Sequence, residues 1–286
     1  MSWCILVNTT PKYMQFAEVQ IACIRNYSDL LEKDRKTYPD LLEKDRKTDS
    51  NLLEQVPIYL ATELTAENEY VKRILELPNV FLLHLQDSET DFLESRVASF
   101  QYLNEYKYIL PLQDDFWLDR APDYKLLDEA ITIMESDRTV QSIRLMPCPG
   151  PLSNIDYLPN LYSSRWKLLS DSDSVLFTFQ ATIWRTKPYI IFLQTLIELN
   201  KPEFISYKQI VSWSKYCISA NIAENTEGQA LFKRLCMSPE LKHLSIERRG
   251  KQANAVFKAP WPYRPTAVVH GILQPWAKEF MEREGF

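Results

Sequence analysis

The chain has 286 residues, of which 45% are hydrophobic and 25% charged, the composition of an ordinary globular protein. Its net charge of -5 offers no basic surface for nucleic acid, and its 5 cysteines form no CxxC pair, which argues against a zinc ribbon or a disulfide framework. The sequence has no apolar run of the roughly 18 to 20 residues that a membrane span requires, and it opens without the basic and apolar segments of a signal peptide. A cytoplasmic protein is therefore expected.

Short apolar runs alternate with helical patterns in the first half of the chain. The expected strands are 3–8, 56–61, 79–84, 107–112 and 140–146. The expected helices are 14–26, 66–77, 88–104 and 124–135. Strands that alternate with helices predict an α/β fold, with a mainly parallel central sheet flanked by helices and right-handed crossovers.

The regularity weakens after Met146. The elements expected beyond it are a strand at 174–179, helices at 187–200, 206–219 and 228–237, a short strand at 267–270 and a helix from Pro275. No change of composition marks a second domain, so a single domain over residues 1–286 is expected.

Residues 27–48 contain a tandem duplication, because "YSDLLEKDRKT" is followed directly by "YPDLLEKDRKT". Pro39 would break a continuous helix, so two short helical turns are expected, started by Asp29 and Asp40 as N-caps. The segment could be a partner-binding arm. A recent duplication in a surface connection is the simpler interpretation, because a longer loop costs little free energy.

Polar residues follow three of the expected strands at their carboxyl ends. They are Asn8, Thr9 and Thr10 after the first strand, Glu63 after the second, and Asp114 and Asp115 after the fourth. In parallel α/β sheets, ligands bind outside the carboxyl ends of the strands. The three sets therefore predict a binding site along one edge of the sheet.

The two aspartates lie in the segment "YILPLQDDFWL", residues 108–118. A hard cation such as Mn²⁺ or Mg²⁺ binds carboxylates together with substrate phosphates. Side chains alternate along an extended strand, so Gln113 and Asp115 are expected to face one way and Asp114 the other. Alternatively, one acid caps a turn and the other pairs with Arg120.

This segment resembles the metal- and nucleotide-binding motif of GT-A-type glycosyltransferases, in which an acidic DXD-like motif ends a central strand. The similarity is to sugar transferases of bacteria and large DNA viruses, and it extends loosely from Trp3 to about Gly285. The chain departs from a strict DXD motif because Gln113 occupies the first position. The resemblance implies a single GT-A-like, Rossmann-related domain, with a nucleotide-sugar-binding half at 1–146 and an acceptor-binding half at 147–286.

The resemblance also implies a donor site at the polar edge. The residues expected to bind the donor are Asn8, Thr9, Thr10, Glu63, Arg96, Gln113, Asp114 and Asp115. Arg96 lies four residues from both Phe92 and Phe100, on the apolar face of its helix, where a guanidinium could hold phosphate through paired donors. Its alternative role is an ion pair with a carboxylate at the end of the sheet.

Further residues take roles from the same resemblance. Gln180 and Trp184 would bind the acceptor, although Trp184 could equally fill the core. Glu224 or Glu227 would act as the general base, although both could simply be acids at the start of a helix. His270, in "AVVHG", would join Asp115 as a metal or diphosphate ligand, although such a histidine is often only a packed residue.

The expected function is transfer of a hexosyl or deoxyhexosyl group from a UDP- or GDP-linked sugar to a hydroxyl of a glycan or another acceptor. The reaction would be inverting and assisted by Mn²⁺ or Mg²⁺. One alternative is a nucleotidyltransferase that makes sugar nucleotides, although "NTTPKY" lacks the Gly-rich phosphate loop usual in that class. The other is a catalytically inactive sugar-binding or scaffold protein.

Overall fold

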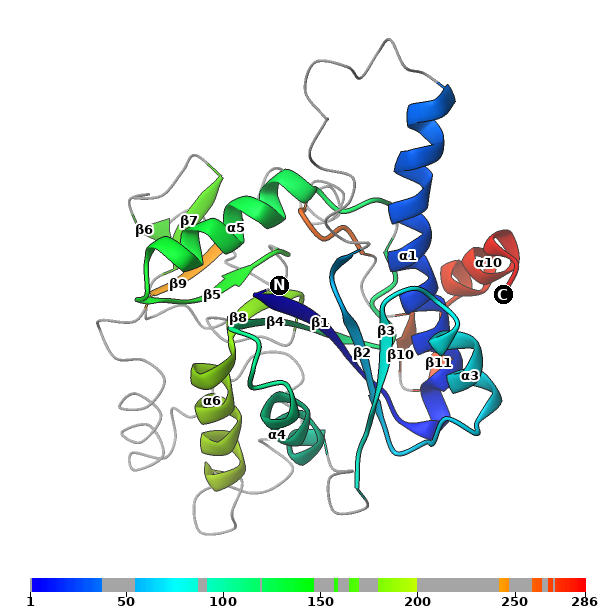
Figure 1. Ribbon diagram of the computed structural model, residues 1–286, viewed down its shortest axis with the longest axis horizontal. Helices are drawn as coiled ribbons and strands as arrows, with labels where there is room; N and C mark the ends of the chain where they lie inside the picture. The colour runs from blue at the N-terminus through cyan, green and yellow to red at the C-terminus, as the bar shows by residue number, and fades with distance from the viewer. Residues whose placement is uncertain are drawn as a thin grey trace.

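The computed structural model describes residues 2–37, 55–86, 92–118, 120–146, 157–158, 165–169, 180–199, 242–246, 259–263, 267–269 and 271–286. Within these ranges a nine-stranded sheet, of order β3-β2-β1-β4-β8-β5-β9-β7-β6, forms the centre of the molecule (Figure 1). A separate hairpin is formed by β10 and β11.

The strands are β1 (Trp3–Asn8), β2 (Ile58–Thr62), β3 (Val80–His84), β4 (Tyr108–Gln113), β5 (Val140–Arg144), β6 (Tyr157–Leu158), β7 (Trp166–Leu169), β8 (Thr182–Arg185), β9 (Lys242–Ile246), β10 (Val268–Val269) and β11 (Ile272–Leu273). The helices are η1 (Pro11–Tyr13), α1 (Met14–Thr37), α3 (Glu69–Leu75), α4 (Phe92–Tyr102), α5 (Tyr124–Ser136), α6 (Thr186–Leu199) and α10 (Pro275–Glu284). The expected strand at 174–179 and the expected helices at 206–219 and 228–237 lie outside the described residues.

The direction of the strands confirms the predicted α/β class and the mainly parallel sheet. β1 pairs in parallel with both β2 and β4, β2 pairs in parallel with β3, and β5 does so with β9. β8 is the exception near the centre, because it lies antiparallel between β4 and β5. β7 pairs antiparallel with both β9 and β6 at the far edge.

The registers bring the carboxyl ends of the first four strands to the same level. Asn8 at the end of β1 is opposite Ala61 of β2 on one side and Gln113 of β4 on the other. Thr62 at the end of β2 is opposite His84 at the end of β3. The loops that follow β1, β2 and β4 therefore leave the sheet side by side, and they carry the polar residues singled out in the sequence.

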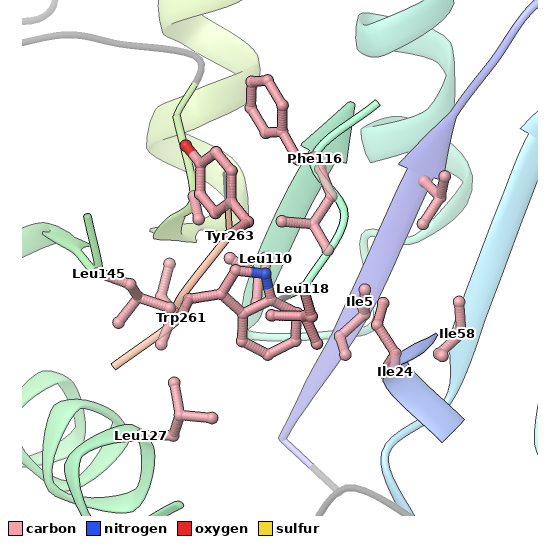
Figure 2. Close-up of a cluster of buried hydrophobic side chains, with 14 of the residues drawn as sticks. Ile5, Ile24, Ile58, Leu110, Phe116, Leu118, Leu127, Leu145, Trp261 and Tyr263 are labelled. Atoms are coloured by element: carbon pink, nitrogen blue, oxygen red, sulfur yellow. The ribbon is translucent and has the colours of Figure 1, made fainter. Parts of the chain in front are cut away.

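Each face of the sheet is covered by helices that bury alternate residues of its strands. Ile5 and Val7 of β1 pack with α1, α5 and α10 on one face, and Cys4 and Leu6 pack with α4 and α6 on the other. Every residue of β1 is buried, as expected of a central parallel strand. Figure 2 shows the first face, where side chains from the sheet meet Ile24 of α1 and Leu127 of α5.

Several helix ends follow from local sequence. The Asp123 carboxylate accepts the N–H of Leu126 at 3.2 Å, so α5 begins at Tyr124 as predicted. Asn68 caps α3 in the same way, and that helix therefore begins later than the predicted residue 66. Pro275 opens α10, and Gly285, with a φ of 82°, ends it.

The first copy of the repeat differs from the prediction. α1 runs without interruption to Thr37, so Asp29 lies inside this helix and does not start a separate turn. The first copy holds no proline and is rich in helix-forming Leu, Glu, Lys and Arg, which lets it extend the helix that precedes it. The second copy, residues 38–48, is outside the described residues. In the described part of the chain, α1 included, no helix is both long and apolar enough to cross a bilayer.

Candidate functional site

A hydrogen bond joins the segments that leave β1 and β4 at the edge of the sheet. Thr9 Oγ1 donates to Asp114 Oδ2 at 2.7 Å, across 105 positions in the sequence. The backbone of Thr9 is held by a third strand, because its N–H donates to the carbonyl of Ala61 at 3.1 Å. Thr9 and Asp114 were both predicted for the donor site, and the structure brings them into contact.

The two aspartates lie in a turn, so the strand alternation on which the prediction for their side chains depends does not extend to them. β4 ends at Gln113, and the N–H of Phe116 returns to the Gln113 carbonyl at 3.3 Å. Once the chain turns, the two-residue period of a strand no longer sets the direction of the carboxylates. Asp115 is 9% exposed, and its carbonyl accepts the N–H of Ala267 at 3.0 Å. The acid turn, residues 113–116, is thus connected to the C-terminal part of the chain.

The carboxyl group of Asp114 has a raised pKa of about 7. Burial is the main cause, and the neighbouring Asp115 carboxylate acts in the same direction. The hydrogen bond from Thr9 and the positive charge of Arg96 oppose the increase. Asp114 is therefore poised between its charged and neutral forms near neutral pH.

Arg96 lies on α4 behind the acid turn, with only 8% of its surface exposed. Burial lowers the pKa of its guanidinium to about 10, and the charge of Asp114 partly offsets this effect. The coupling of Arg96 to Asp114 agrees with its alternative role as a partner of a carboxylate at the end of the sheet.

Asn8 connects the same helix to the end of β1. Its Nδ2 donates to Ser99 Oγ at 2.9 Å, and Ser99 Oγ donates in turn to the Ser95 carbonyl at 2.6 Å. Ser95 and Ser99 flank Arg96 on α4, so this contact holds the helix, and with it Arg96, against the edge of the sheet. Asn8, which is predicted to bind the donor, therefore also has a structural role: it attaches α4 to the end of β1.

The remaining donor residues also lie along this edge. Glu63 directly follows β2 and is partly exposed, and its carbonyl contacts His84 Nε2 at 3.1 Å. Thr10 is exposed at the start of η1, where its carbonyl accepts the N–H of Tyr13 at 2.9 Å. Gln113 ends β4 and is partly buried. All eight residues predicted for the donor site thus belong to this edge or, in the case of Arg96, to the helix behind it.

Gln180 reaches the same region from the opposite half of the chain. β8 is antiparallel to β4, with Trp184 opposite Ile109, so the residues that precede β8 lie toward the carboxyl end of β4. The side-chain oxygen of Gln180 accepts a hydrogen bond from Tyr263. The ring of Tyr263 stacks on that of Phe116, the last residue of the acid turn, with 4.6 Å between centroids (Figure 2).

Trp184, by contrast, is a core residue. It is 2% exposed and packs against Tyr189 and Phe192, with ring centroids 4.5 and 5.7 Å away. Its partner in the register is Ile109, at the start of β4 and away from the polar edge. The indole therefore fills the core, as its alternative interpretation had it, and it has no part in the function proposed below.

Glu224, Glu227 and His270 lie outside the described residues. Gly271 adopts a φ of 79°, and a Cβ placed there would be 3.9 Å from Tyr13 Oη and 4.0 Å from Lys12 Nζ. The turn of the β10–β11 hairpin thus lies beside η1, the segment that leaves β1 at the polar edge.

Sequence reasoning missed three aromatic residues at this edge. Trp117 and Phe116 belong to the acidic segment itself, where their position directly after the two acids was the available signal. Tyr263 lies in "WPYRP", whose sequence gives no indication that it returns to the acid turn. Among the described residues, no group of three or more His, Cys, Asp and Glu side chains is arranged to hold a metal ion.

No protein-family model matches this chain, and no curated protein sequence does. Distant likenesses exist among solved structures. The S. aureus TarS 1-349 structure aligns over 91% of this chain and 66% of its own length, with 11% identity and a TM-score of 0.43. The same fragment in complex with UDP-GlcNAc aligns over 89% of this chain and 61% of its own, with 12% identity and a TM-score of 0.38.

Two further likenesses are to a xylosyltransferase and a synthase. Mouse xyloside xylosyltransferase 1 aligns over 84% of both chains, with 12% identity and a TM-score of 0.39. The 4-diphosphocytidyl-2C-methyl-D-erythritolsynthase of Anaerococcus prevotii aligns over 89% of this chain and 95% of its own, with 11% identity and a TM-score of 0.38. TM-scores below 0.5 do not establish a shared fold, so function has to be argued from the residues of this chain.

Proposed function

We propose that this chain is a glycosyltransferase that takes a sugar from a nucleotide diphosphate and transfers it to a hydroxyl of a glycan or another acceptor. The observation that carries the proposal is the Thr9–Asp114 hydrogen bond, which joins the segments that follow β1 and β4, next to Asp115. It gathers acids and small polar side chains at the edge where parallel α/β sheets bind ligands. The resemblance of "YILPLQDDFWL" to the GT-A motif gives that edge its proposed donor, a UDP- or GDP-linked sugar.

A divalent cation, Mn²⁺ or Mg²⁺, is part of the proposal. The two adjoining carboxylates fit a hard cation whose other ligands are substrate phosphates, which needs no large protein cage. Asp115 is proposed as the main ligand from the resemblance, and Asp114, which accepts from Thr9 and is coupled to Arg96, lies beside it. His270 is proposed as a further ligand from the resemblance. When bound, the cation would offset the negative charge of the leaving diphosphate.

The acceptor is proposed to approach from the side of Gln180, which the Tyr263–Phe116 stack connects to the acid turn. A general base must lie within hydrogen-bond reach of the attacking hydroxyl. Glu224 and Glu227 are the proposed candidates for that role. Direct attack on the anomeric carbon would invert its configuration, and a hexosyl or deoxyhexosyl donor is proposed.

Nucleotide binding tests the proposal first. UDP and GDP are titrated into the protein by calorimetry, with and without Mn²⁺, and the same titration is repeated with Asp115→Asn. Tighter binding in the presence of Mn²⁺, weakened in the variant, is the expected result. A protein that binds neither nucleotide would refute the proposal and favour a scaffold.

A panel of nucleotide sugars then separates the two enzymatic alternatives. A glycosyltransferase releases the nucleoside diphosphate from its donor, whereas a nucleotidyltransferase exchanges pyrophosphate with a nucleoside triphosphate. Each product is measured with the wild-type protein and with Asp115→Asn. Pyrophosphate exchange without release of nucleoside diphosphate would assign the other class.

A further inference from the structure

Trp117 ties the acid turn to the first helix. Its side chain is fully buried, and its Nε1–H lies 3.0 Å from the Asp114 carbonyl and 3.1 Å from the Phe16 carbonyl of α1. One N–H is thus shared between the turn and the helix. A second link runs parallel to it, because Gln20 of α1 donates to the Phe116 carbonyl at 3.4 Å.

The indole ring of Trp117 also contacts the C-terminal helix. Its ring centroid lies 6.0 Å from that of Trp276 and 5.7 Å from that of Phe280, both on α10, and 5.9 Å from that of Phe16 on α1. Rings at these distances attract one another beyond the apolar area that they bury. Trp117 is therefore the side chain on which α1, α10 and the acid turn meet.

The helix that Trp117 holds is connected back to Asp115. Gln274, the N-cap of α10, donates its N–H to the Ala267 carbonyl at 2.8 Å, and Ala267 donates its own to the Asp115 carbonyl at 3.0 Å. The β10–β11 hairpin lies between these two residues. A closed path thus runs from the Trp117 ring through α10 and the base of the hairpin to Asp115.

We propose that Trp117 is a positioning residue for the acid pair. Its N–H sets the backbone of the turn at Asp114, and its ring sets α10 and thereby the hairpin that is bonded to Asp115. It touches neither substrate nor cation, and it acts through the two aspartates. Its effect on catalysis rests on the proposed function, whereas its effect on the geometry of the turn does not.

The physical argument is one of preorganisation. A turn of two aspartates brings two negative charges together, and their repulsion favours conformations in which the carboxylates separate. Bonds to the backbone on either side restrict those conformations before any ligand arrives. Residues that orient ligating carboxylates in this way typically alter metal affinity or activity by about 10- to 100-fold when they are changed.

Trp117→Phe tests the proposal, because it removes the N–H and keeps an aromatic ring. The matched control is Trp261→Phe. Trp261 is an equally buried indole of the same core cluster, and its N–H has no hydrogen-bond partner among the described residues (Figure 2). Both variants lose the same atoms from the core, so their difference reports the hydrogen bonds and ring contacts that are particular to Trp117.

Two measurements are made on each full-length variant. Hydrogen–deuterium exchange of the backbone amides at 113–118 is expected to rise in Trp117→Phe and to stay at the wild-type level in Trp261→Phe. The kcat of sugar transfer at saturating donor is expected to fall by about 10- to 100-fold in Trp117→Phe and to stay within about twofold in the control.

Wild-type exchange at 113–118 in Trp117→Phe would overturn the proposal, as would an equal loss of kcat in both variants. Failure of the proposed function is recognised separately. In that case the wild-type protein transfers no sugar from any donor, and the exchange measurement alone decides whether Trp117 positions the turn.

Discussion

Two polar pairs join neighbouring segments of the same sheet, and they differ in where they lie along the strands and in how deeply they are buried. Thr9 Oγ1 and Asp114 Oδ2 are 2.7 Å apart, just beyond the ends of β1 and β4. Ser142 Oγ and His243 Nδ1 are 2.8 Å apart, on paired residues within β5 and β9. Judged by residue type alone, the serine–histidine pair is the more obvious catalytic candidate.

Position decides between them. Ser142 and His243 are 2% and 3% exposed, and the Trp184 ring packs near the imidazole with 6.0 Å between centroids, so no substrate reaches this pair. Asp114 is partly exposed, and it lies in a turn at the edge from which loops leave the sheet. A polar pair in the middle of a sheet contributes to packing and stability, whereas a pair at the carboxyl ends is available to a ligand.

The largest effect is expected at the edge of the sheet. Asp115→Ala removes the main proposed ligand of the cation, and turnover should fall by about 100- to 1000-fold, as when another group that stabilises developing charge is lost. Sugar transfer is measured at saturating donor, and thermal unfolding checks that the variant is folded. Near-wild-type turnover in a folded variant would contradict the assignment of the active site to the acid turn.

Replacement of Arg96 tests the charge behind the acid turn. Arg96→Met leaves Asp114 without a buried positive partner, which typically costs about 3 to 5 kcal/mol of unfolding free energy. The loss should be smaller at pH 6 than at pH 8, because a protonated Asp114 needs no counter-charge. Urea denaturation at the two pH values measures it.

The control for this comparison is Arg25→Met. Arg25 is also buried, and it donates to the carbonyl oxygens of Val56 and Asn79 at 2.8 and 3.0 Å. Its loss should destabilise the protein by a similar amount at both pH values. Equal pH dependence in the two variants would show that Arg96 is not coupled to Asp114.

Ser142→Ala tests the pair in the middle of the sheet. It leaves the buried His243 without its Ser142 partner, which is expected to lower the unfolding free energy by about 1 to 3 kcal/mol. Turnover of the remaining folded protein should be unchanged. A variant that is stable but inactive would place chemistry at this pair and reverse the comparison.

The smallest effect concerns the pH dependence of stability. The folded chain holds the Asp114 proton up to about pH 7, whereas the unfolded chain releases it near the ordinary pKa of 3.8. The unfolded state therefore binds fewer protons in this range, and the contribution of Asp114 to the unfolding free energy falls as the pH rises from about 4 to about 7. Below that range the full contribution is present.

Asp114→Asn removes this titration. The unfolding free energy of the variant, relative to wild type, should rise steadily between about pH 4 and pH 7. Urea denaturation in metal-free buffer at several pH values measures the difference. A constant difference across that range would mean that the pKa of Asp114 is not raised in the folded protein.

Much of the fold followed from local sequence. β1 occupies the predicted residues 3–8, because a short apolar run that ends on Asn-Thr-Thr is typical of a buried strand followed by a loop. The first residues of β2, β3, β4 and β5 are also at most two positions from those predicted. β7 and β9 were not predicted, because "WKLL" and "KHLSI" are short and mix polar with apolar residues, a pattern that single strands share with loops.

The sequence by itself determined the alternation of strands and helices, and it placed acids at the end of β4, because these features depend on neighbours within a few residues. Tertiary structure alone decided that Thr9 meets Asp114, that β8 enters between β4 and β5 in the opposite direction, and that Tyr263 reaches Gln180 across 83 positions. These contacts join segments far apart in the chain, and they arise from burying the two faces of one sheet under different helices. No local pattern encodes that choice, which is why the two aspartates could be recognised in the sequence but the contact of Asp114 with Thr9 could not.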